Sequence, residues 1–236
     1  MATPTLIYCA DGNAKFARIA VETGFMYGAQ LPPRGLPFPP YFADQNWKKP
    51  NRERYMAELA KHRPFMASVL DWEKSEQLSE VLSWAEDAAR FANVVMIIPK
   101  VIGQVSRLPR IIGGKSVRLG YSIPTKFGGT PVPLAEFVGW PVHLLGGSPK
   151  KQRRISGFLN VVSVDGNYAQ KIAVRYNKFW DGSNWRKLSD YGGKVEKDAP
   201  YVAFRRSCQG IMAMWHTSTP QPNTNPLQPN GYQLGF

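Results

Sequence analysis

The sequence predicts a parallel α/β protein built as a TIM-like (β/α)8 barrel that is small or incomplete. Three observations lead to this prediction: short apolar runs alternate with helical segments, polar loops follow the runs, and the runs number six or seven. A closed barrel of this kind requires eight strands, so one is hidden, missing or replaced. Residues 1–217 are expected to form one domain. Residues 218–236, rich in Pro, Asn and Gln, are expected to be a disordered tail.

Apolar runs mark the expected strands. They lie at residues 6–10, 25–31, 65–70, 94–98, 117–123, 141–145 and 159–164. The run at 94–98 is the clearest, because an uninterrupted apolar run is typical of a parallel strand covered on both faces. The run at 25–31 is the weakest. Residues 32–50 contain six prolines and are expected to be a loop without regular structure.

Helical spacing of apolar residues marks the expected helices. They lie at residues 14–23, 52–62, 76–91, 167–176 and 199–214, with a short basic helix after Pro149. The segment 76–91 is the best of them, because its apolar side chains form one stripe. Asn13 is expected to cap the first helix, and Gly24 to end it.

The charge balance predicts a polyanionic partner. The chain has 30 Lys and Arg against 17 Asp and Glu, a formal net charge of +13. Nucleic acid is the first candidate, and an anionic membrane the second. A solvated basic surface is the alternative. The cations expected to contact nucleic acid are Lys150, Lys151, Arg153, Arg154, Arg205 and Arg206.

Cysteine and histidine usage argues against several protein classes. Two cysteines, Cys9 and Cys208, cannot form a disulfide framework or an all-cysteine zinc site. The three histidines stand in no metal-binding motif, and His62 and His143 are expected to be structural, so no metal is predicted. No apolar stretch approaches the roughly 20 residues that cross a bilayer. The chain is therefore expected in the cytoplasm, or in the host cytoplasm if it is phage-encoded, without a membrane partner or a signal peptide.

Three aspartates follow expected strands: Asp11, Asp71 and Asp165. In parallel α/β folds catalytic groups gather at this edge of the sheet. Two converging carboxylates suit glycosidic-bond chemistry, in which one attacks the sugar carbon and the other moves protons. Capping of the following helix is the alternative for each single aspartate. Three aspartates on one rim favour a shared site over three separate helix caps.

A short internal repeat adds two pocket candidates. Asp11-Gly12-Asn13 resembles Asp165-Gly166-Asn167, and each stands where a strand passes into a helix. If the first and last strands are neighbours, Asp11 and Asp165 would face each other across the barrel mouth. Asp11 and Asn167 are therefore expected near the substrate, with a helix cap as the alternative for Asp11.

A glycine-rich turn, Gly146-Gly147-Ser148-Pro149, follows an expected strand and opens a helix. Free N–H groups in such a turn can hold a phosphate, although a tight turn is the simpler interpretation. The turn lacks the P-loop ending and the Rossmann spacing, so no nucleotide cofactor is predicted.

From residue 120 to residue 170 the order of segments resembles the tRNA-guanine transglycosylase superfamily. The matching pieces are Gly120-Tyr121-Ser122-Ile123-Pro124 for the base-binding turn, Leu144-Leu145-Gly146-Gly147-Ser148-Pro149 for the glycine turn, and Val161-Val162-Ser163-Val164-Asp165 for the strand that ends in the nucleophile. Upstream, Ser68-Val69-Leu70-Asp71 is similar to the strand end that carries the second aspartate. Val95-Met96-Ile97-Ile98-Pro99 resembles the strand of the base-reading glutamine, which is absent here and for which Lys100 or Gln104 can substitute.

The resemblance favours one branch of that superfamily. The tRNA-acting members carry a zinc subdomain with three cysteines and one histidine, which this shorter chain cannot form. The DNA-acting (DpdA-type) branch of phages and bacteria, which installs 7-deazaguanine bases in DNA, fits a compact chain without zinc. The resemblance thus implies a DNA guanine transglycosylase in DNA hypermodification, acting on double-stranded or locally opened DNA with a free base such as 7-cyano-7-deazaguanine.

The resemblance also implies roles for single residues. Asp165 would attack C1′ of a flipped-out deoxyguanosine, and Asp71 would move protons on the leaving and entering bases. The substrate would contact Gly120, Tyr121, Ser122, Ile123, Pro124, Gly146, Gly147 and Lys100, and no cofactor or ATP is required. A base-removing DNA glycosylase, an RNA-acting base exchanger and a non-catalytic nucleic-acid-binding module are the alternatives.

Overall fold

The structure, a computed structural model, describes residues 3–10, 13–125, 128–191 and 197–217. Asp11, Gly12 and the expected tail at 218–236 lie outside the described residues. Within the described residues, none of the helices is both long and apolar enough to cross a membrane.

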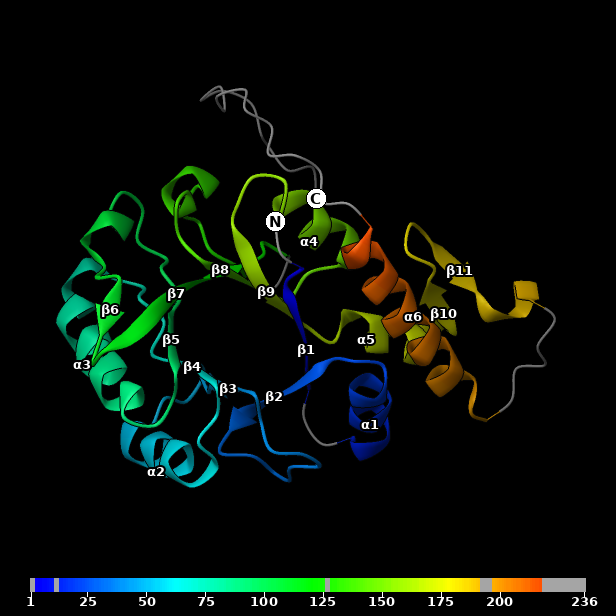
Figure 1. The fold of residues 1–236 in the computed structure, drawn as a ribbon, viewed down its shortest axis with the longest axis horizontal. Helices are drawn as coiled ribbons and strands as arrows, with labels where there is room; N and C mark the ends of the chain where they lie inside the picture. Colours follow the sequence, from blue (N-terminus) through cyan, green and yellow to red (C-terminus); the bar gives the residue numbers. More distant parts are fainter. Residues whose placement is uncertain (1–2, 11–12, 126–127, 192–196, 218–236) are drawn as a thin grey trace.

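Eight parallel strands close into a barrel, so the predicted TIM-like fold is confirmed (Figure 1). Every strand pairs in parallel with its two neighbours, and the pairings of β5 with β7 and of β1 with β9 complete the ring. The strands are β1 (Thr5–Cys9), β2 (Met26–Leu31), β3 (Phe42–Gln45), β4 (Met66–Ser68), β5 (Val94–Ile97), β7 (Lys115–Ser122), β8 (Val142–Leu145) and β9 (Val161–Asp165).

The eighth strand is β3, which lies inside the predicted loop at 32–50; the prediction of no regular structure there is wrong. Phe42 pairs with Gly28 of β2 and with Met66 of β4. The Tyr41 N–H donates to the carbonyl of Tyr27 at 2.8 Å, which starts the pairing immediately after the prolines. Phe42 and Ala43 are completely buried. Neighbouring strands rather than local apolar content therefore specify β3.

The helical layer is less regular than the strands. The helices are α1 (Ala14–Glu22), α2 (Arg52–His62), α3 (Leu78–Ala89), α4 (Pro149–Ile155), α5 (Tyr168–Tyr176) and α6 (Ala199–His216). The connection from β2 to β3 has no α-helix among its residues, and β5 reaches β7 through η2 (Val105–Arg107) and the short antiparallel strand β6 (Ile111–Ile112). In the described part of the connection between β7 and β8 the helical segment is η3 (Leu134–Phe137), while η1 (Ser75–Gln77) precedes α3. The barrel is incomplete in its helices, not in its strands.

An addition follows α5. The hairpin of β10 (Lys178–Trp180) and β11 (Trp185–Lys187), which the sequence did not predict, leads through η4 (Leu188–Tyr191) toward α6. Figure 1 shows α6 lying against α5 and the hairpin on one side of the barrel. The main chain of Trp180 donates to the buried hydroxyl of Ser207 at 3.0 Å, which joins the hairpin to α6.

Two apolar layers hold the barrel together. Residues that point outward from the strands, such as Tyr8 and Val95, pack under the helices in the larger core. Residues that point inward form a small core of their own: Ile7, Phe42, Met66, Val94, Met96 and Ile98. The ring of Phe42 reaches across the interior to His143 on the opposite side, with 5.2 Å between ring centroids. The alternation follows from the two-residue period of a strand.

The asparagines of the two repeat copies differ in their capping of the following helix. Asn13 caps α1 as predicted, because its side-chain oxygen accepts the N–H groups of Lys15 and Phe16 at 3.1 and 3.3 Å. Asn167 precedes α5 without a side-chain capping bond. The strands that precede them are neighbours, since Ile7 of β1 pairs with Asp165 of β9.

Candidate active site

Asp165 is the last residue of β9 and lies at the carboxyl end of the barrel, where active sites of this fold are found. Its side chain is only 8% exposed. The Gly146 N–H donates to Oδ1 of Asp165 at 2.8 Å, and Nε2 of His143 lies 3.9 Å from Oδ2. One oxygen is therefore fixed by the main chain of a neighbouring strand end, while the other faces a histidine.

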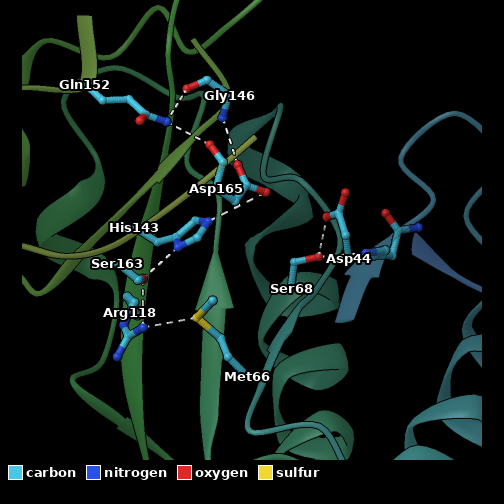
Figure 2. A network of polar contacts seen from close by, with 10 residues as sticks. Asp44, Met66, Ser68, Arg118, His143, Gly146, Gln152, Ser163 and Asp165 are labelled. Atoms are coloured by element: carbon cyan, nitrogen blue, oxygen red, sulfur yellow. Dashed lines mark hydrogen bonds and ion pairs between the residues drawn. The ribbon is translucent and has the colours of Figure 1, made fainter. Parts of the chain in front are cut away.

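A row of polar side chains continues from Asp165 into the barrel (Figure 2). Nδ1 of His143 lies 2.6 Å from Oγ of Ser163, and Nη1 of Arg118 donates to the same oxygen at 2.9 Å. Nη1 of Arg118 also lies 3.3 Å from Sδ of Met66. Burial lowers the pKa of Arg118 from its ordinary value. A guanidinium therefore lies inside the barrel and connects to Asp165 through a hydroxyl and an imidazole.

The turn after β8 is built around Asp165. Gly146 and Gly147 both have positive φ angles, +67° and +79°, which favour glycine. Nε2 of Gln152 on α4 donates to the carbonyl oxygens of Gly146 and Asp165, at 2.9 and 2.7 Å. The turn, the helix and the end of β9 thus form one hydrogen-bonded unit. In this unit the Gly146 N–H is directed at the carboxylate rather than at the solvent.

Asp71 lies three residues beyond β4 and has different surroundings. Its Oδ2 pairs with Nζ of Lys100 at 2.7 Å, and the same ammonium lies 3.0 Å from Oε1 of Glu73. Burial raises the pKa of Asp71, and Lys100 only partly offsets this effect. The ring of Trp47, which is 54% exposed, lies 5.9 Å from Nζ of Lys100. This end of the site therefore offers an ion pair beside an exposed aromatic ring.

The strands that lead to Asp71 and Asp165 stand opposite each other in the ring. Three strands separate β4 from β9 in either direction around the barrel. Each carboxylate has its own partners: Lys100 for Asp71, and Gly146 with His143 for Asp165. The two carboxylates therefore follow strands on opposite walls of the barrel.

A third carboxylate stands on β3. Oγ of Ser68 donates to Oδ1 of Asp44 at 2.9 Å and accepts the Gln45 N–H at 2.7 Å. Figure 2 shows this pair across the barrel from Asp165 and His143. Asp44 was missed because β3 was not predicted. Its signal was present, since Asp44 alternates with the apolar Phe42 and so shares the inward face of the strand.

The predicted base-binding segment continues the sheet. Gly120 faces the interior, where an added Cβ would lie 2.7 Å from Cγ1 of Ile98. Tyr121 points outward and packs edge-on against Phe137, with 5.1 Å between ring centroids. The Ile123 N–H donates to the carbonyl of Leu145 at 3.1 Å. Ser122 is the last residue of β7, and Pro124 lies two residues beyond it.

The predicted nucleic-acid contacts fall on two helices. Lys150, Lys151 and Arg154 are exposed on α4, whereas Arg153 donates to the carbonyl of Thr217 at 3.0 Å. Lys150, Arg153 and Arg154 line a hollow of about 720 Å³ against the end of α6. On α6, Arg205 pairs with Glu22 at 2.8 Å, and Arg206 lies over the ring of Phe179. The cations on α4 are therefore more available to a ligand than Arg205 is.

Sequence reasoning missed His143, Ser163, Arg118 and Gln152 as members of the site. His143 and Ser163 had a signal: each is a polar residue in the middle of a buried apolar strand, and such residues need a partner. The identity of that partner was not readable, because Ser163 lies 20 residues beyond His143 and 45 beyond Arg118. Gln152 was hidden within a run of four cations.

Comparisons with known proteins give a family and a distant fold likeness. Residues 19–216 match the model of a family described as "Family of unknown function (DUF6610)". No curated protein matches the chain. Among solved structures, monomers of dimeric phosphoribosylanthranilate isomerase from Thermotoga maritima are similar at a TM-score of 0.37 and 11% identity, over 89% of this chain and 98% of the other. A likeness this distant says nothing about the chemistry of the site.

Proposed function

Because this chain belongs to the DUF6610 family, whose function is unknown, we propose its activity from the site: it exchanges guanine in DNA for a 7-deazaguanine base through a covalent glycosyl ester on Asp165. The observation that carries the proposal is the environment of Asp165. Its carboxylate ends a barrel strand, is nearly buried, and has one oxygen held by a main-chain N–H while the other faces Nε2 of His143. An oriented, desolvated carboxylate is suited to attack a sugar carbon.

The first step forms the ester. Oδ2 of Asp165 attacks C1′ of a flipped-out deoxyguanosine, the bond from C1′ to N9 breaks, and its electron pair goes to guanine, which takes up a proton. Asp71 is the group assigned to supply that proton. Its raised pKa keeps a larger fraction protonated than an ordinary aspartate would have.

The second step reverses the first with a different base. N9 of the entering 7-deazaguanine attacks C1′, the ester bond to Asp165 breaks, and the electron pair returns to the carboxylate. The proton of N9 passes to Asp71. No oxidation and no hydrolysis of ATP is needed, because the energy of the glycosidic bond is conserved in the ester.

The charge of the protein supports a nucleic-acid substrate. The net charge is +13, and α4, which begins directly after the turn that holds Asp165, presents Lys150, Lys151 and Arg154 to the solvent. Phosphates bind such cations whatever the sequence of the strand. Gln152 on the basic helix α4 therefore connects that helix directly to the main chain of the candidate nucleophile.

The experiment combines the protein with duplex DNA and isotope-labelled 7-cyano-7-deazaguanine, followed by nucleoside mass spectrometry. We expect labelled nucleoside in the DNA with the wild type and none with Asp165→Asn. Asp190→Asn, which changes an exposed aspartate on η4, is the matched control and should exchange as the wild type does. Abasic sites without label would identify a glycosylase, and label in RNA alone would identify an RNA-acting exchanger. If the wild type forms neither labelled nucleoside nor abasic sites, the proposed catalysis is contradicted and a nucleic-acid-binding module is the remaining interpretation.

A further inference from the structure

The hydrogen-bond partners of Ser163 restrict where the proton of His143 can be. Nη1 of Arg118 can only donate, so at 2.9 Å it uses a lone pair of Oγ of Ser163. The hydroxyl of Ser163 still has its own hydrogen to give. Nδ1 of His143, 2.6 Å away and completely buried, is the acceptor that the described contacts offer to that hydrogen.

This arrangement determines the tautomer of the imidazole. If Ser163 donates to Nδ1, that nitrogen carries no hydrogen, and the neutral ring must carry it on Nε2. Nε2 is buried, has no hydrogen-bond partner among the described residues, and lies 3.9 Å from Oδ2 of Asp165. The opposite assignment, with a hydrogen on Nδ1, would turn two donors toward Oγ of Ser163 and leave the Ser163 hydrogen without an acceptor among the described contacts.

We propose that Arg118 and Ser163 hold His143 as the neutral Nε2–H tautomer, and that His143 is a positioning residue which directs Oδ2 of Asp165. This inference rests on the proposed function of Asp165. An Nε2–H aimed at Oδ2 keeps the carboxylate in one orientation for attack on C1′. When the ester breaks in the second step, negative charge returns to the carboxylate, and the same N–H stabilises it.

In the protein without substrate, the distance of 3.9 Å between Nε2 of His143 and Oδ2 of Asp165 is too long for a hydrogen bond. Hydrogen bonds of catalytic groups are often long without substrate and shorten when it binds. The histidine therefore contributes mainly in the complex with DNA, and its loss should lower kcat more than it raises KM.

Nitrogen-15 NMR of the histidine side chains tests the tautomer directly. The chain has three histidines, so the spectrum is simple, and His143→Gln identifies the signals of His143 by their disappearance. We expect one protonated nitrogen, Nε2, in the wild type and a mixture of both tautomers in Ser163→Ala. A hydrogen on Nδ1, or on both nitrogens, in the wild type would overturn the inference.

Two isosteric substitutions test the role. His143→Gln can place an amide N–H where Nε2 stands, while His143→Asn can replace only the Nδ1 side facing Ser163. We expect His143→Gln to keep kcat within about threefold of the wild type and His143→Asn to lower it by about 10- to 100-fold, at similar KM. Circular dichroism and thermal unfolding establish that each variant folds. If either variant fails to fold, Ser163→Ala carries the kinetic test, with an expected loss in kcat of about threefold or more.

The outcomes separate this inference from the proposed function. An active wild type whose kcat is unchanged by His143→Asn would contradict the role of His143 and leave the function of Asp165 intact. A wild type without base exchange that still shows the Nε2–H tautomer would contradict the proposed function and leave the arrangement of Arg118, Ser163 and His143 intact.

Discussion

Gly146 and Asp165 are joined by a hydrogen bond of 2.8 Å from the Gly146 N–H to Oδ1, which ties the turn after β8 to the end of β9. The bond spans 19 residues and ties the orientation of the proposed nucleophile to a two-glycine turn. Any change that reshapes this turn should therefore alter the orientation of the carboxylate. The same turn is held from the other side by Gln152.

Gly147→Ala tests the dependence of Asp165 on the turn. The φ angle is +79°, and an added Cβ would lie 2.7 Å from Cδ1 and 3.2 Å from Cβ of Ile123. We expect base exchange to fall by at least about tenfold and the free energy of unfolding to fall by about 1–3 kcal/mol. Urea unfolding and exchange kinetics provide the two measurements.

The matched control is Gly103→Ala. Its φ angle is +76°, nearly that of Gly147, but nothing lies within 4 Å of an added Cβ. This variant isolates the cost of the backbone conformation alone and should leave base exchange unchanged. Equal losses of activity in both variants would contradict the control of Asp165 by the turn.

Gly120→Ala should destabilise the barrel from within. The added methyl group would lie 2.7 Å from Cγ1 of Ile98 and 2.9 Å from Cδ1 of Leu145, both in the interior. Overpacking of this kind costs about 1–3 kcal/mol, measured as a lower midpoint in urea. Gly35→Ala, where nothing lies within 4 Å, should change the midpoint little. If Gly120→Ala has the same midpoint as the wild type, the barrel interior can accommodate a methyl group at this position and the prediction is wrong.

Asp71 should make stability fall as the pH rises. Burial raises its pKa in the folded protein above the ordinary value of 3.8. The folded state therefore binds the proton more tightly than the unfolded state. Its contribution is complete below about pH 3.8 and is lost as the pH rises through the folded pKa, by about 1.4 kcal/mol for each unit between the two values.

The measurement is the difference in free energy of unfolding between the wild type and Asp71→Asn, from urea titrations between pH 3.5 and about pH 7. We expect the free energy of unfolding of the wild type to fall relative to that of Asp71→Asn as the pH rises. Glu73→Gln removes the exposed second partner of Lys100 and controls for the loss of an ion pair. A difference that shifts in favour of the wild type would mean that Lys100 outweighs burial at Asp71.

The cations of α4 should determine the salt dependence of DNA binding. Replacing Lys150, Lys151 and Arg154 by Ala should weaken binding and make the slope of log K against log salt less negative, by about 0.9 for each lost phosphate contact. A second triple variant changes three exposed cations on other segments: Lys61 on α2, Arg90 at the end of α3 and Arg107 on η2. The same change in slope for both triples would contradict a DNA-binding role for α4 in particular.

The sequence was sufficient for most of the barrel, because apolar periodicity reports burial directly. All seven expected strands are present, and Asp165 does end a strand. The strand β3 was hidden because its four residues follow a proline-rich segment and carry one strongly apolar side chain, Phe42. Its pairing with β2 and β4 supplies what its own composition lacks.

The polar interior was the part that sequence could not assemble. The sequence shows that His143 and Ser163 interrupt apolar strands, but not that both face inward at paired positions of β8 and β9. Arg118 alternates with the outward-facing Val117 and Leu119, which is a pattern that solvent-exposed arginines also follow. Only the closed ring, in which β7, β8 and β9 are successive neighbours, brings the three side chains together.

The most direct test of the account is the mass of the protein after a denaturing quench in the presence of DNA and without a free base. Peptide mapping should locate a deoxyribosyl–DNA adduct on the peptide that contains Asp165, with guanine released in equal amount, and Asp165→Asn should form no adduct. Released guanine with an adduct on another residue, or DNA bound without any adduct in the wild type, would contradict the assignment of Asp165 as the nucleophile.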